Sequence, residues 1–124
     1  MAQNYIVNDI VMYKNRIHTI IDTLGLNNYE LSYVRHPVNR AELSGVPLTP
    51  EILEKNGWKK EMYHDWRHYL PLERTLLYLS KGVDRDGAFA VCVGLDMSQI
   101  ACISFVHQLQ HLLLVLNINS EMEV

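Results

Sequence analysis

The stretch LTPEILEKNGW, residues 48–58, decides the fold because it predicts one short capped helix between two β-rich halves. Thr49 is a good N-cap, and Pro50 suits the first helical position, where no backbone N–H donor is needed. Gly57 suits the left-handed position that ends a helix, and Trp58 can then pack back onto it. A helix in this place, with strands before and after it, predicts an α+β fold.

Before this helix, the sequence predicts an antiparallel β meander. Two β-rich runs, Ile10–Tyr13 and Ile17–Ile21, flank Asn15, which tolerates the positive φ of a tight hairpin turn. A third strand is expected at Tyr29–Val34, where apolar and polar residues alternate. An SH3-like half-barrel is one form that this meander can take. The Pro- and Gly-containing segment 35–47 is expected to be an irregular connection between two lobes.

After the helix, the sequence predicts a second antiparallel sheet and a terminal helix. Ala88–Gly94 and Gln99–Ile103 are nearly continuous apolar runs, so both strands are expected to be central or covered on both faces. The last helix is expected from Ser104, as N-cap, to about Asn117. Its apolar face should pack on this second sheet, and it comprises Phe105, Leu109, Leu112, Leu113 and Leu116. We therefore expect a β-meander lobe at 1–46 and an α+β lobe at 47–124, which can also form one compact domain.

Composition excludes several classes of protein. The chain has 124 residues, 48% hydrophobic and 20% charged, which is typical of a folded domain rather than a disordered or fibrous chain. Its net charge of −3 argues against nucleic acid as a partner, because phosphate contacts need excess positive charge. The longest apolar run, Leu112–Leu116, is too short to span a bilayer, and no secretory signal begins the chain. A cytoplasmic protein without membrane contact is therefore expected.

The two cysteines, Cys92 and Cys102, lie in apolar strand segments. We expect two free, buried thiols that act as small hydrophobic side chains. A disulfide between paired strands is the alternative, which a reducing cytoplasm disfavours.

Histidine is the feature that invites a chemical hypothesis, since six are present. His64 and His68 are four residues apart, as are His107 and His111, and such pairs share one face of a helix and can chelate a metal ion. Neither pair lies in an HExxH motif, and a closed structural site would need two further ligands. A metal-binding protein that uses these histidines is therefore an alternative rather than the leading hypothesis.

The leading hypothesis is a non-catalytic interaction module. The sequence contains no phosphate-binding, dinucleotide-binding or hydrolase motif, so we expect no enzyme activity and no cofactor. His107 and His111 are expected on the outward face of the last helix, together with Leu114 and Val115. Apolar side chains on an outward face are typical of an interface, here with a second copy of the chain or with another protein. A further alternative is weak nucleic-acid binding by the N-terminal lobe through Lys14, Arg16 and Arg35.

Three segments together resemble a family of small uncharacterised proteins encoded by prophages and mobile elements of gut bacteria. They are the opening NDIV at 8–11, VPLTPEILEKNGW at 46–58 and FVHQLQH at 105–111. Trp58 and Phe105 stand where this family has Phe and Tyr. The resemblance implies a β opening, a capped helix and a helix near the C-terminus. It also implies a phage-related origin, and with it a phage or host protein as a partner. It implies no activity and no catalytic residue.

Overall fold

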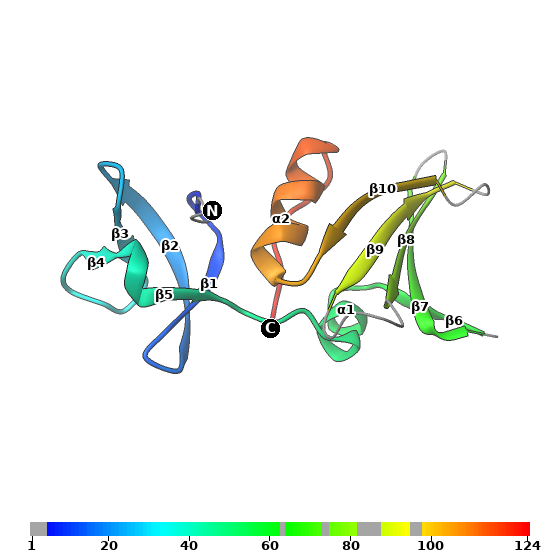
Figure 1. Ribbon diagram of the computed structural model, residues 1–124, viewed down its shortest axis with the longest axis horizontal. Coiled ribbons are helices and arrows are strands. Elements are labelled where there is room, and N and C mark those ends of the chain that lie inside the picture. Colours follow the sequence, from blue (N-terminus) through cyan, green and yellow to red (C-terminus); the bar gives the residue numbers. More distant parts are fainter. Residues whose placement is uncertain (1–4, 63, 73–74, 82–87, 95–97) are drawn as a thin grey trace. The chain divides into compact units, whose positions relative to one another are not determined.

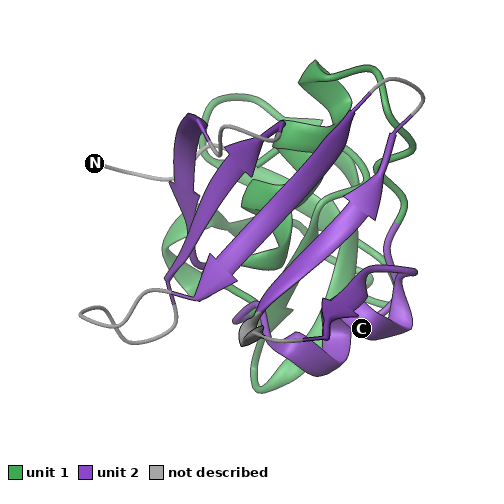
Figure 2. Cartoon of the chain, turned by 90° about the vertical axis from the view of Figure 1, so that its right-hand side faces the viewer, with its two compact units in different colours: residues 1–46, 105–121 green, residues 47–104, 122–124 purple. Residues whose placement is uncertain are grey.

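The computed structural model describes residues 5–62, 64–72, 75–81, 88–94 and 98–124, apart from the side chains of 64–66. These residues form two compact units, which Figure 2 distinguishes by colour. The first unit comprises 1–46 and 105–121, and the second comprises 47–104 and 122–124. The first unit is thus built from two separate pieces of the sequence.

The first unit contains a five-stranded antiparallel sheet with the order β4-β3-β2-β1-β5 (Figure 1). Its strands are β1 (Ile10–Tyr13), β2 (Arg16–Leu24), β3 (Asn28–Leu31), β4 (Val38–Asn39) and β5 (Leu43–Gly45). Its buried cluster comprises Tyr5, Val11, Tyr13, Ile20, Tyr29, Leu31 and Val38. Among the residues described, β4 and β5 are separate edges and the sheet does not close, so an SH3-like barrel is not supported.

The turn of the first hairpin forms as its sequence predicts. Lys14 and Asn15 both have positive φ, 48° and 63°, and Tyr13 pairs with Arg16 across them. Two successive positive φ values give the turn a twist that matches that of the paired strands. The segment 35–47, in contrast, is more regular than expected, because it holds β4, a 3-10 turn η1 (Arg40–Glu42) and β5.

Helix α2 (Val106–Val115) belongs to the first unit, where it contacts β1. This differs from the expected packing of the terminal helix on the C-terminal sheet. Its N-cap is Phe105 rather than Ser104, and the Phe105 N–H donates to Oε1 of Gln108 at 3.0 Å. The fold therefore returns the chain, after residue 104, to the sheet with which it began.

The second unit starts with α1 (Pro50–Lys55), which forms as expected. The Thr49 hydroxyl accepts the Ile52 N–H at 3.2 Å, and Gly57 has φ of 90°. Trp58 is buried, and its backbone N–H donates to the Leu53 carbonyl at 3.0 Å. The capping residues thus define both ends of this two-turn helix.

The sheet of the second unit is an antiparallel meander in the order β10-β9-β8-β7-β6. Its strands are β6 (Lys59–Glu61), β7 (His64–Pro71), β8 (Leu76–Lys81), β9 (Phe89–Val93) and β10 (Ser98–Ile103). The hairpin of β9 and β10 is confirmed. The expected covering of both strands is wrong for β10, which is an edge strand with mostly exposed residues, including Ile100.

Taken together, the predicted α+β class is confirmed, with an N-terminal antiparallel meander, a short capped helix and a C-terminal antiparallel sheet. Both cysteines are free; Cys92 is buried as expected, whereas Cys102 is exposed on β10. Among the described residues, no helix is long and apolar enough to cross a membrane.

Candidate functional site

The candidate site lies in the first unit, where one face of α2 meets the segment that leads into β1. Gln110 joins the two, because its Oε1 accepts the Ile10 N–H at 2.9 Å and its Nε2 donates to the Asn8 carbonyl at 2.9 Å. Asn8 has φ of 78°, so the chain turns sharply here. A buried amide side chain that satisfies two backbone groups fixes this turn against the helix.

Beside Gln110, the partly exposed His111 side chain lies within hydrogen-bond distance of the buried Asp9 carboxyl. The His111 Nε2 is 2.7 Å from the Asp9 Oδ2, and the Ile6 N–H donates to the same oxygen at 2.9 Å. Burial raises the pKa of the Asp9 carboxyl, while these two hydrogen bonds act in the opposite direction. The His111 side chain is one-third exposed whereas that of Asp9 is buried, so this contact extends from the interior of the unit to its surface.

His107 is buried, which corrects the expectation that it points outward. It is 2% exposed, its ring centroid is 4.9 Å from that of Tyr5, and it stacks on Phe105 at 5.8 Å. Burial lowers the pKa of His107 to about 4, and the nearby His111 acts in the same direction. His107 is therefore neutral at physiological pH, and its Nδ1 is buried without a hydrogen-bond partner among the described residues.

The physical reason for this burial is that residues 5–9 cover a side of α2 that the sequence pattern leaves open. The buried residues of the helix are Val106, His107, Leu109, Gln110 and Leu113. The buried face of the helix therefore differs from the apolar face that the sequence predicts, because it also includes His107 and Gln110. His107 consequently contributes to the core of the unit and not to its surface.

Leu114 and Val115 are exposed, at 54% and 82% of their surface. Leu114 lies with Ile6 and Val7, which are also exposed, around a small cavity of about 60 Å³. We name Ile6, Val7, Leu114 and Val115 the α2 patch. Ile6, Val7 and Leu114 line this cavity together with Asn8, Asp9, Gln110 and Ser120, and Val115 follows Leu114 on the helix. Only the helical part of the patch was expected.

The other histidine pair, His64 and His68, lies on strand β7. Residues four apart on a strand have Cα atoms about 13 Å apart, so they cannot share a metal ion as on a helix. His68 is buried, and burial lowers its pKa while the charge of Glu54, 4.0 Å away, opposes this. Within the described part of the chain, no three His, Cys, Asp or Glu side chains are grouped as a metal site would require.

The basic residues considered for nucleic acid are all exposed in the first unit. Lys14 lies in the hairpin turn, Arg16 follows that turn, and Arg35 follows β3. Binding of nucleic acid through these side chains stays a prediction.

Sequence reasoning missed Tyr5, Asp9 and Gln110, which hold the site together. The available signals were a polar Gln110 within an apolar helix and the apolar run Tyr5-Ile6-Val7 ahead of the first strand. Comparison with protein-family models, curated proteins and solved structures found no match to this chain. Its function is therefore argued from its own contacts.

Proposed function

We propose that this protein is a non-catalytic interaction module that self-associates through the α2 patch. The observation that carries the proposal is the exposure of neighbouring apolar side chains from two parts of the sequence, Leu114 beside Ile6 and Val7, with Val115 following on the helix. Exposed apolar side chains that lie together, rather than singly, are typical of an interaction surface.

A second copy of the same chain is the partner that fits this surface best. A twofold interface brings identical patches face to face, so a charged patch would repel itself. The α2 patch has no charged residue, and Asp9, which lines the same small cavity, is buried against His111. Its faces can therefore meet without like-charge repulsion, with the partly exposed His111 at the margin.

The resemblance of 46–58 and 105–111 to small prophage proteins supports a phage-related accessory role. The lack of catalytic motifs in the sequence supports a function by binding rather than by reaction. A reducing cytoplasm suits the chain, because its exposed thiol, Cys102, would stay free there.

The test is sedimentation velocity across a wide range of protein concentrations. We expect the unaltered chain to dimerise as concentration rises, and the double variant Leu114→Ser, Val115→Ser to remain monomeric. Leu26→Ser is the matched control, because Leu26 is 90% exposed but lies in the turn between β2 and β3. Far-UV circular dichroism checks that each variant is folded. A monomer at every concentration, or equal dimerisation of all three proteins, contradicts the proposal.

A further inference from the structure

A second cavity lies in the first unit, and the α2 patch does not include its lining. It is open to solvent and has a volume of about 620 Å³. This is within the range of sites that bind small molecules. Its lining comes from the N-terminal segment, the β2–β3 turn, the segment from β4 to β5, and the N-cap of α2.

One wall of the cavity is aromatic and tightly fixed. Tyr5 and Phe105 both line the cavity, and His107 packs against both rings from within the core. Gly45 lies against the Phe105 ring so closely that a Cβ there would be 2.6 Å from its Cγ. Because Gly45 does not have a positive φ, the close packing, not the backbone, is what requires glycine here.

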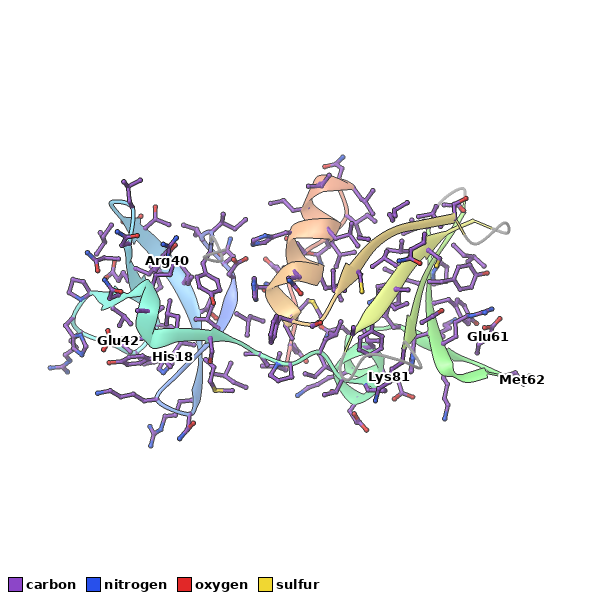
Figure 3. The ribbon with its side chains drawn as sticks, viewed as in Figure 1. His18, Arg40, Glu42, Glu61, Met62 and Lys81 are labelled. Carbon is purple, nitrogen blue, oxygen red and sulfur yellow. The ribbon has the colours of Figure 1, made fainter. Side chains whose placement is uncertain are left out.

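The lining of the cavity also has polar residues, among them Arg40. This residue begins η1, and its N–H donates to the Asn27 carbonyl at 2.7 Å. The Asn39 Oδ1 accepts the Ala41 N–H at 2.9 Å, and the Glu42 Oε2 accepts the Asn39 N–H at 3.1 Å. These bonds form a capping box that holds the turn, and with it the start of the Arg40 side chain (Figure 3).

The charge of the lining has one sign. Arg40 is the single charged residue among the described residues that line the cavity, and the others are apolar, hydroxyl or amide. Burial raises the pKa of the Tyr5 hydroxyl, and the positive charge of Arg40 acts against that rise. Tyr5, Phe105 and Arg40 all line this one cavity, so one ligand can contact both the aromatic rings and the guanidinium.

We propose that this cavity binds a small aromatic anion, with its ring against Tyr5 and Phe105 and its carboxylate or phosphate against the Arg40 guanidinium. Guanidinium groups bind both kinds of oxyanion through paired N–H donors. Asn27 also lines the cavity, and its amide side chain offers donors and an acceptor to polar groups of the ring.

The test uses two probes, indole-3-acetate for an aromatic carboxylate and adenosine monophosphate for an aromatic phosphate. Their neutral counterparts, indole-3-acetamide and adenosine, keep the ring and remove the charge. Binding to the full chain is followed by NMR through the backbone amides of residues 39–45 and of Phe105. We expect saturable shifts with at least one anion, whose affinity exceeds that of its neutral counterpart by about tenfold. The anion that binds distinguishes a carboxylate site from a phosphate site.

Three variants test whether the Arg40 guanidinium is the group that binds the anion. Arg40→Gln should weaken anion binding by about tenfold and leave the affinity for the neutral counterpart unchanged, whereas Arg40→Lys should retain part of it. Arg35→Gln is the control, since Arg35 is exposed and does not line the cavity. The proposal is overturned if neither anion shifts these amides up to its solubility, or if anions and neutral counterparts bind equally. The ligand comparison needs no variant, so it decides the matter even if Arg40→Gln fails to fold.

Discussion

Acidification from pH 7 to pH 5 should destabilise the first unit through His107. The folded chain holds this imidazole at a pKa of about 4, because it is buried between Tyr5 and Phe105 and close to His111. In the unfolded chain a histidine has a pKa of about 6.5. Between these values the unfolded chain binds more protons, so stability falls as the pH falls.

The magnitude follows from the difference between the two pKa values. A difference of about 2.5 corresponds to about 3 kcal/mol of unfolding free energy, which is present above pH 6.5 and fully lost below pH 4. By pH 5 the loss should be about 2 kcal/mol. Asp9 acts in the opposite direction, because burial raises its pKa and folding therefore favours its protonated form. Burial also lowers the pKa of His68, in the second unit, so this histidine likewise reduces the stability of the chain as the pH falls.

The assay is urea denaturation at pH 7, 6 and 5, followed by far-UV circular dichroism. The variant His107→Phe keeps a ring against Phe105 but cannot be protonated, and His107→Leu removes both ring and charge. Both should lose about 2 kcal/mol less than the unaltered chain between pH 7 and pH 5. His36→Gln is the control, because His36 is exposed, and it should keep the full dependence on pH. The reasoning is refuted if the His107 variants retain this dependence, or if NMR titration gives His107 a pKa near 6.5.

Two further predictions concern the buried amide of Gln110 and the exposed thiol of Cys102. Gln110→Leu should cost about 2 kcal/mol or more of stability in urea denaturation, because it leaves the Ile10 N–H and the Asn8 carbonyl without their partner; a loss below about 0.5 kcal/mol would count against the role of this amide. A thiol reagent should modify Cys102 rapidly in the folded chain and Cys92 only in denaturant, since Cys102 is exposed and Cys92 is buried; mass spectrometry of the peptides identifies the modified thiol, and equal rates would contradict the exposed position of Cys102.

The parts of the fold that the sequence predicts well are those determined within a few residues. The cap at Thr49, the left-handed Gly57 and the turn at Asn15 each depend on local backbone geometry, and each is present. Helix ends and hairpin turns satisfy their own hydrogen bonds nearby, so the neighbouring residues carry enough information.

The parts that differ from expectation depend on contacts between distant residues. His107 is buried because residues 5–9 lie on α2, and no pattern inside the helix indicates that cover. The apolar run of β10 predicts a covered strand, yet the order of strands places it at an edge. The candidate site could be predicted only in part, since Leu114 and Val115 follow from the helix period whereas Asp9 and Gln110 require the tertiary fold.

The division of the first unit into two pieces has a consequence for the order in which a newly made chain folds. Gln110 must meet Ile10 across 100 residues, and closing so long a flexible loop costs about 4 kcal/mol of chain entropy. The second unit reduces that cost, because its own ends meet where the Leu48 N–H donates to the Ser104 carbonyl at 2.9 Å. During synthesis on a ribosome, residues 47–104 emerge before α2 and can close this gap first. The inserted sequence would then guide the late docking of α2, so mutations that unfold the second unit should also delay completion of the first.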